Sequence, residues 1–363
     1  MFLLKFRLTI AMLSFGFFGL LMYHGGNAAQ STADISLAPA KTVIVPHQPG
    51  GFEAGINFYI NTQDYSGSDD LEHKLNSILD RLVDNNLNAV SLVWSIYTGD
   101  VNSSSIFMGP GTPTDQDLAL IIEQAHKRGF IVTIRPTIDE RSIMNDRQDW
   151  RGTIRPTNVD QWFAEYTAVM LRYAALAQAH KVHAFVVGAE LNSMEKYITR
   201  WKTLITSVDE VFGGLLSYSS NQGFNPKFPW KHLDYVGIDA FFELTTPANG
   251  ATAEDMLKSA KTWVAWARRK VVPAGLPIIL AEVGTRAQQN AHKKSWLWGH
   301  NTPLDLDDQS NYYQAICKAW KPLVQGIYWW NVTLNLPEDL ASDSGFVPLG
   351  KPAEAQMSSC FSS

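Results

Sequence analysis

Two glutamates each stand at the end of a short apolar run. Glu190 follows residues 184–189 (Ala-Phe-Val-Val-Gly-Ala), and Glu282 follows residues 277–281 (Pro-Ile-Ile-Leu-Ala). Runs of this length and composition predict strands that are buried on both faces of a parallel sheet. Parallel strands of α/β folds place their chemistry at their carboxyl ends. A single glutamate there is usually solvated or ion-paired, but two, each after a strand too apolar for an unpaired charge, indicate a catalytic pair.

Paired glutamates among aromatic side chains suit the cleavage of glycosidic bonds. One carboxylic acid protonates the leaving oxygen while the other carboxylate attacks the anomeric carbon, and a separation of about 5 to 5.5 Å gives retention of configuration. The 12 Trp, 12 Tyr and 18 Phe suit a core and also suit stacking on sugar rings. The 9 His fall mostly in predicted helices or loops, so we expect no metal site and no cofactor. A Gly-x-Ser-x-Gly motif is missing, which disfavours a serine hydrolase.

The elements that must position these glutamates alternate along one uninterrupted span. We predict eight strands, at residues 55–60, 89–94, 130–136, 184–189, 215–218, 235–242, 277–283 and 326–332, with helical spacing of apolar residues between most of them. The pattern predicts an α/β protein built as a single (β/α)8 TIM barrel. A doubly wound sheet would need a glycine-rich loop after the first strand, where this chain has Asn57, Phe58 and Tyr59. In the barrel, Glu190 ends the fourth strand and Glu282 the seventh.

Helix starts are marked by capping residues. Thr114 and Thr252 precede two apolar helical repeats, and Asn158 precedes a third. Asn192 and Glu195 have the spacing of a capping box, so we assign Glu195 to the start of a helix and not to catalysis.

The N-terminus differs in composition from the rest of the chain. Residues 1–29 combine an early positive charge, an apolar core and small residues at the end, which is typical of a secretory signal peptide; an uncleaved membrane anchor is the alternative. Residues 30–51 are rich in Ala, Pro and Ser and form a linker or N-terminal strap, and residues 52–363 form the catalytic domain. We therefore expect a secreted or periplasmic protein, without stable membrane insertion after signal cleavage, in which Cys317 and Cys360 are able to pair.

Several motifs together resemble glycoside hydrolase family 113. They are residues 150–152 (Trp-Arg-Gly) with Pro156 and 162–163, then 187–191, 281–284, 326–330 and 350–353. The resemblance extends from about Gly55 to the C-terminus. That family contains β-1,4-mannanases within a large barrel clan of retaining glycosidases, and the resemblance implies that Glu190 is the general acid/base and Glu282 the nucleophile. Ala189 replaces the Asn that much of the clan has before the acid/base, and Thr285 stands where an aromatic residue is frequent, so the sugar specificity carries over less directly than the mechanism.

Further residues are candidates for binding the substrate. Arg135 at the end of the third strand either keeps the nucleophile ionised, holds a sugar hydroxyl or forms a structural ion pair. Tyr218 either donates a hydrogen bond to Glu282 or packs in the core, and Asp239 either orients a catalytic neighbour or forms a surface ion pair. Trp330 is expected to form a platform under the sugar. The set is completed by Asn57 and Trp94, the latter grouped with further aromatic residues of the predicted mouth: Tyr97, Trp150, Trp296 and Trp298.

The sequence favours an exported, monomeric glycoside hydrolase that acts on a polysaccharide or oligosaccharide. An endo-acting β-mannanase is the first hypothesis, and a hydrolase of another β-glycan or of an envelope exopolysaccharide is the second. A catalytically silent barrel that only binds glycan is the alternative from another class of function. The formal charge of -5 disfavours a nucleic-acid partner.

Overall fold

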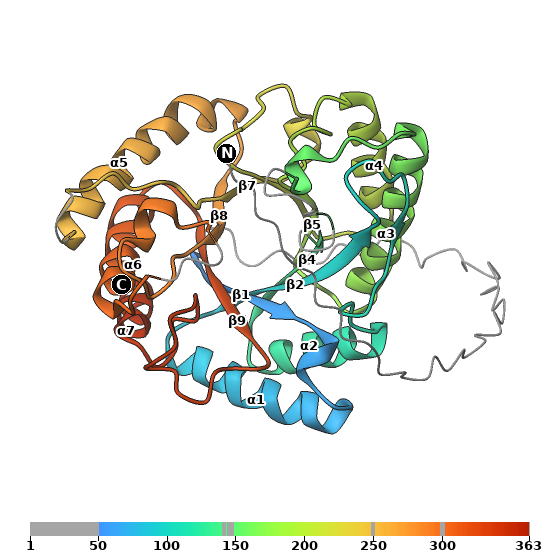
Figure 1. The fold of residues 1–363 in the computed structure, drawn as a ribbon. Coiled ribbons are helices and arrows are strands. Elements are labelled where there is room, and N and C mark those ends of the chain that lie inside the picture. Colours follow the sequence, from blue (N-terminus) through green and yellow to red (C-terminus); the bar gives the residue numbers. More distant parts are fainter. Residues whose placement is uncertain (1–50, 140–142, 144–148, 248–250, 298–301, 363) are drawn as a thin grey trace, which may run out of the picture. The chain divides into compact units, whose positions relative to one another are not determined.

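The computed structural model describes residues 51–139, 143, 149–247, 251–297 and 302–362. The predicted signal peptide, nearly all of the predicted linker and Trp298 lie outside these residues. Eight parallel strands form a closed barrel (Figure 1). They are β1 (Glu53–Ile60), β2 (Ala89–Thr98), β4 (Ile131–Ile138), β5 (Ala184–Ala189), β6 (Leu215–Ser220), β7 (Tyr235–Asp239), β8 (Ile278–Val283) and β9 (Gly326–Thr333). Because β1 pairs with both β2 and β9, the sheet has no open edge, and the predicted (β/α)8 barrel is confirmed.

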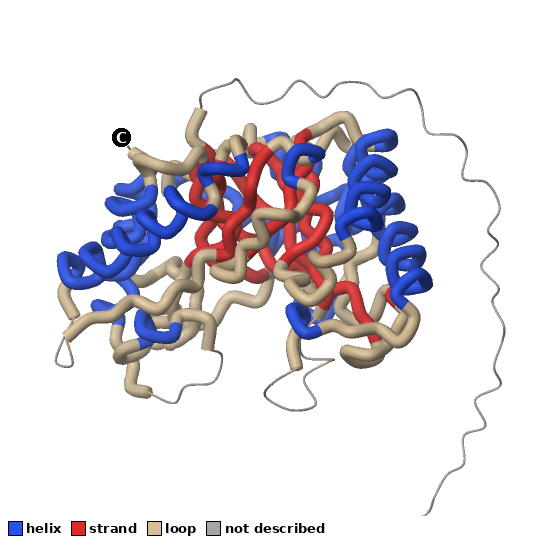
Figure 2. Tube along the Cα trace, turned by 90° about the horizontal axis from the view of Figure 1, so that it is seen from above, coloured by secondary structure: helices blue, strands red, loops and turns tan. Residues whose placement is uncertain are grey.

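Helices cover the outside of the barrel, as Figure 2 shows for the blue helices flanking the red strands. They are α1 (Ser68–Asp84), α2 (Asp115–Lys127), α3 (Val159–Ala179), α4 (Ile198–Val211), α5 (Ala253–Lys270), α6 (Leu306–Trp320) and α7 (Pro352–Phe361). Between β6 and β7 the connection contains only a 3-10 turn, Trp230–His232. A two-residue strand that the sequence did not predict, β3 (Ile106–Phe107), pairs antiparallel with β2.

Three of the predicted helix caps are confirmed. Thr114, Asn158 and Thr252 each accept a hydrogen bond from the backbone N–H three residues later, which satisfies a donor at the first turn. The predicted capping box at Glu195 is wrong. Helix α4 begins at Ile198 with Tyr197 as its cap, and the Glu195 side chain is buried in the interior.

The interior of the barrel changes in character from one end to the other. A floor of apolar and aromatic side chains closes the amino-terminal end of the strands: Ala89, Ile131, Ala184, Tyr235, Ile279 and Tyr328. Successive residues of a strand alternate between the two faces, so Thr133, Arg135 and Thr137 share the inner face with Ile131. Polar groups therefore begin directly above the floor, and they lead towards the carboxyl ends of the strands.

Two further features are a disulfide and the hydropathy of the helices. Cys317 of α6 and Cys360 of α7 form a disulfide. Among the residues that the structure describes, no helix combines the length and hydropathy needed to cross a membrane.

Candidate active site

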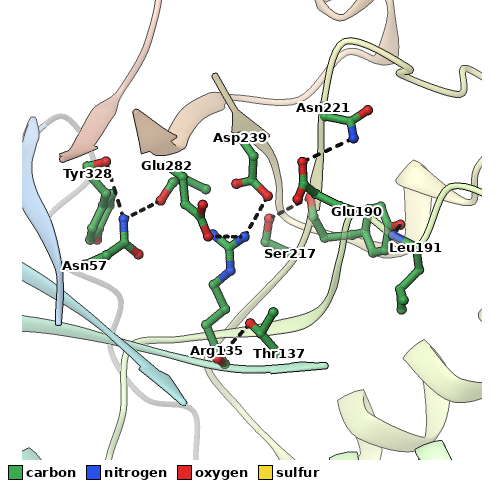
Figure 3. Close-up of polar contacts among 12 residues, drawn as sticks. Asn57, Arg135, Thr137, Glu190, Leu191, Ser217, Asn221, Asp239, Glu282 and Tyr328 are labelled. Carbon is green, nitrogen blue, oxygen red and sulfur yellow. Dashed lines mark hydrogen bonds and ion pairs between the residues drawn. The ribbon is translucent and has the colours of Figure 1, made fainter. Parts of the chain in front are cut away.

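Glu282 lies in β8 and is buried at the carboxyl end of the barrel. One carboxylate oxygen is 2.8 Å from Nη2 of Arg135 (Figure 3). The backbone of β8 passes close to β9 just beyond this point. A Cβ at Gly284 would lie 2.6 Å from the carbonyl oxygen of Trp330, so glycine permits the close approach of the two backbones two residues after Glu282.

Arg135 of β4 holds two carboxyl groups at once. The same Nη2 that contacts Glu282 donates to Oδ2 of Asp239 at 2.6 Å, and the side chains of Arg135 and Asp239 are almost completely buried. Ion pairs removed from water are favourable only when their geometry and hydrogen bonds are good. Arg135 therefore forms buried ion pairs, which connect Asp239 to Glu282, and its part in catalysis stays a prediction.

The electrostatics around Glu282 are those of a crowded acidic site. Burial raises the pKa of the Glu282 carboxyl well above its usual range; Arg135 opposes this effect, and the negative charges of Asp239 and Glu190 reinforce it. A further opposing charge comes from Arg151. Carboxyl groups that interact in this way titrate together and favour a state in which one of them keeps a proton. The pKa of the Glu282 carboxyl is therefore raised by burial and by neighbouring negative charge, and the two arginines limit the rise.

Glu190 follows β5 and occupies a different environment. It is half-buried, and its φ of 53° lies in the left-handed region that non-glycine residues rarely adopt. Its backbone N–H donates to the carbonyl of Ser219 at 2.9 Å, and one side-chain oxygen accepts from Nδ2 of Asn221 at 3.2 Å (Figure 3). A neutral amide donor is compatible with a carboxylate and with a carboxylic acid. The side chain of Glu282 is thus paired with a cation, and the side chain of Glu190 is in contact with an amide.

Trp330 lines a cavity of about 660 Å³ at the mouth of the barrel. Its ring contacts Tyr59 and Phe241, with centroid distances of 6.3 Å in both cases. The cavity lies at the carboxyl ends of β1, β2, β4 and β9, and its lining includes Arg151, whose charge acts on Glu282. Neither glutamate is among the residues that line this cavity, and the role of Trp330 as a sugar platform stays a prediction.

The structure contradicts three of the expected substrate contacts. The alternation along each strand points Tyr218 and Trp94 outwards, away from the mouth. Tyr218 donates to Glu195 at 3.0 Å and not to Glu282, and Trp94 is buried against Tyr173 of α3, with ring centroids 4.9 Å apart.

Asn57 is also engaged within the protein. Its buried side-chain amide donates to the backbone carbonyl of Ala281 at 2.9 Å, and it is 3.4 Å from the carbonyls of Tyr328 and Trp329. It therefore links β1 to β8 and β9 directly before Glu282, and it supports the strand that carries Glu282 instead of contacting sugar.

Two residues of the site were missed from the sequence. Asn221 contacts Glu190, and its only signal was a polar residue directly after a predicted strand. Glu195 was assigned to a helix start, although it lies within five residues of Glu190. Within the described part of the chain, no group of three or more His, Cys, Asp or Glu side chains is arranged to hold a metal ion.

Comparison with known proteins agrees with the barrel and its motifs. A family 113 β-1,4-mannanase structure has a TM-score of 0.75 at 20% identity, covering 86% of this chain and 99% of that one. The family 113 β-mannanase AaManA from Alicyclobacillus acidocaldarius, in complex with ManMIm, has a TM-score of 0.74 at 23% identity, covering 88% and 99%. The hyperthermostable endo-1,4-β-D-mannanase from Thermotoga petrophila has a TM-score of 0.55 at 14% identity, covering 85% and 98%. These similarities show that the chain has the same fold as those proteins.

At the level of sequence, no curated protein is significantly similar to this chain. The model of Glycoside Hydrolase Family 113, however, matches residues 66–351, which include both glutamates and nearly the whole barrel. The chain therefore belongs to Glycoside Hydrolase Family 113 and is a glycoside hydrolase.

Proposed function

We propose that this enzyme is an endo-acting β-1,4-mannanase that cleaves its substrate with retention of configuration. The observation that carries the division of roles is the buried ion pair between Glu282 and Arg135. Burial raises the pKa of Glu282, and the guanidinium of Arg135 opposes that rise and favours the ionised form that a nucleophile needs. Glu190 receives the neutral amide of Asn221, which also accommodates a proton.

In this mechanism Glu282 attacks the anomeric carbon while Glu190 gives its proton to the departing glycosidic oxygen. The covalent glycosyl–enzyme that results no longer carries the negative charge of Glu282. Loss of that charge removes repulsion from the neighbouring Glu190, which then accepts a proton from the attacking water. Release of the sugar restores the ionised Glu282 and the protonated Glu190.

The choice of β-mannan rests on the family and on the β-mannanases that share the fold. Trp330 supplies an aromatic surface in the mouth for a pyranose ring. Purified enzyme should be assayed on mannan, glucomannan, xylan, β-glucan and bacterial exopolysaccharides. We expect internal cleavage of mannan, seen as a rapid fall in chain length. Faster cleavage of an exopolysaccharide than of mannan would instead identify an envelope-polymer hydrolase.

The catalytic roles are tested by replacing each glutamate and adding azide. Glu282→Ala should abolish turnover and be partly rescued by azide with a product of inverted configuration. Glu190→Ala should still react with an activated aryl glycoside, and azide should restore turnover with retained configuration. If neither replacement slows hydrolysis by about 10²-fold, the low end for loss of a proton-transfer group, the assignment of both residues is wrong, whereas a wild type without turnover on any substrate would indicate a barrel that only binds glycan.

We also propose that the enzyme is exported as a monomer, after removal of residues 1–29, and that residues 52–363 form its catalytic domain. The disulfide between Cys317 and Cys360 supports an oxidising compartment. Mass measurement of protein from the periplasmic or secreted fraction should give an N-terminus near Ala28 or Ala29, with a mass in solution equal to one chain. An intact N-terminus in the membrane fraction would favour an anchor.

A further inference from the structure

Tyr218 of β6 connects two segments that follow the proposed acid/base. Its ring is fully buried, with centroids 5.4 Å from Trp201 and 4.3 Å from Phe228. Its hydroxyl accepts a hydrogen bond from the backbone N–H of Leu191 at 2.9 Å and donates one to Oε1 of Glu195 at 3.0 Å. A phenol has a single proton to donate. Because that proton goes to Glu195, the oxygen lone pairs are directed to Leu191.

The residue before Leu191 is Glu190, whose backbone is in the left-handed conformation. Such a conformation is unfavourable for a residue other than glycine and persists only where neighbouring groups impose it. The end of β6 provides three such groups. The carbonyl of Ser219 holds the N–H of Glu190, the hydroxyl of Tyr218 holds the N–H of Leu191, and Asn221 contacts the Glu190 carboxyl itself.

Glu195 fixes the other side of this arrangement. It is only 2% exposed, and a carboxyl group buried to this degree is costly without hydrogen bonds. Tyr218 and Asn225 supply them. The segment between the two glutamates is itself folded back, since the N–H groups of Met194 and Glu195 both bond to the carbonyl of Leu191. The Tyr218 hydroxyl therefore forms hydrogen bonds with both ends of the turn that follows Glu190, at Leu191 and at Glu195.

We propose that Tyr218 and Glu195 are positioning residues that aim the Glu190 carboxyl at the glycosidic oxygen. This inference rests on the proposed acid/base role of Glu190. It assigns a task to a buried carboxyl and a buried phenol that touch neither the substrate nor Glu282. The rival explanation is that the pair only stabilises the fold.

The two explanations differ in how activity depends on the leaving group. A sugar leaving group needs a proton from Glu190, whereas 2,4-dinitrophenolate departs without one. We therefore expect Tyr218→Phe, which removes only the hydroxyl, to lower kcat/KM on β-1,4-mannopentaose by about 10- to 100-fold, the loss typical of a misplaced catalytic group. The same variant should lower the rate of glycosylation by 2,4-dinitrophenyl β-mannobioside less than about 3-fold, within the context-dependent scatter of a lost buried hydrogen bond. The ratio of the two rates is independent of the fraction of folded enzyme.

Tyr166→Phe is the matched control. Tyr166 is also buried, and its hydroxyl donates a hydrogen bond of 3.1 Å to the carbonyl of Val187. Val187 lies in β5, three residues before Glu190. Its replacement removes the same atom, and we expect it to leave the ratio of the two rates unchanged. A second variant, Glu195→Gln, retains an oxygen that accepts from Tyr218 and should keep most of the activity on mannopentaose, whereas Glu195→Ala should resemble Tyr218→Phe.

Glu190→Gln separates this inference from the proposed function. If Glu190→Gln changes the leaving-group ratio and Tyr218→Phe and Glu195→Ala do not, the positioning role is wrong and the acid/base role stands. If Glu190→Gln itself leaves the ratio unchanged, both are wrong. An equal loss on both substrates in Tyr218→Phe shows that the pair only stabilises the fold and also overturns the inference.

Discussion

The buried Glu195 should make the stability of the protein depend on pH in a measurable way. Burial, opposed by hydrogen bonds from Tyr218 and Asn225, raises the pKa of Glu195 from 4.5 to about 7. Between these two values the folded protein binds a proton that the unfolded chain releases. Stability therefore falls as the pH rises from 4.5 through about 7, by about 3 kcal/mol at about 1.4 kcal/mol per pH unit. Glu195→Gln removes the titrating group and should remove this part of the pH dependence.

The measurement is urea unfolding of both proteins, with the disulfide intact, at pH 5 and at pH 8. Other carboxyls also titrate across this range, but they are present in both proteins and cancel in the difference. We expect the wild type to lose about 2.5 kcal/mol more than Glu195→Gln between the two pH values, because part of the effect lies below pH 5. Glu210→Gln, on the exposed face of α4, is the control, because its side chain is in water in both states. If wild type and Glu195→Gln lose the same stability to within about 0.5 kcal/mol, the scatter of surface substitutions, Glu195 does not titrate as argued.

Three other outcomes follow from the site and the fold. Arg135→Met should lower kcat by at least about 10²-fold. It should also move the acidic limb of the pH profile of kcat/KM to higher pH, because loss of the cation raises the pKa of Glu282 further. An unchanged limb would contradict the pairing. Trp330→Ala should raise KM roughly 10-fold with a smaller change in kcat, as expected for lost ring stacking. Steady-state kinetics on mannopentaose test this, and an unchanged KM would show that the sugar does not stack on Trp330. Replacing Cys317 and Cys360 by Ser should lower the free energy of unfolding by about 4 kcal/mol, since the disulfide closes a loop with a sequence separation of 43. Urea titration measures this loss, and a loss below about 1 kcal/mol would contradict the prediction.

The barrel and the two glutamates could be predicted because each strand is a short apolar run with a clear end. Glu190 and Glu282 interrupt such runs, and parallel strands in one barrel bring their carboxyl ends together. Arg135 and Asp239 were candidates for the same reason, although their direct contact joins strands 104 residues apart and only the fold shows it.

The errors concern which way a side chain points. Tyr218 and Trp94 lie in the predicted strands but on the outer face, and a strand with apolar residues on both faces carries no periodic signal that separates the two. The irregular register between β7 and β8, with a shift between Ile238 and Asp239, is likewise absent from the sequence pattern. Glu195 matched the spacing of a capping box, but its hydrogen bond to Tyr218 draws it into the core and the helix begins later.

The apolar floor of the barrel has a consequence for the timing of proton transfer. Tyr235 and Tyr328 belong to the layer beneath Arg135, and the hydroxyl of Tyr328 is already committed to Glu53 at 2.6 Å. Protons therefore reach Glu190 and Glu282 from the mouth, and in the proposed mode of binding, with a sugar against Trp330, the substrate covers that route. The proton used for cleavage is then the one that the enzyme carries when the substrate binds. The pH of the solution therefore sets the fraction of free enzyme in the active protonation state, and we expect kcat/KM to depend on pH more strongly than kcat.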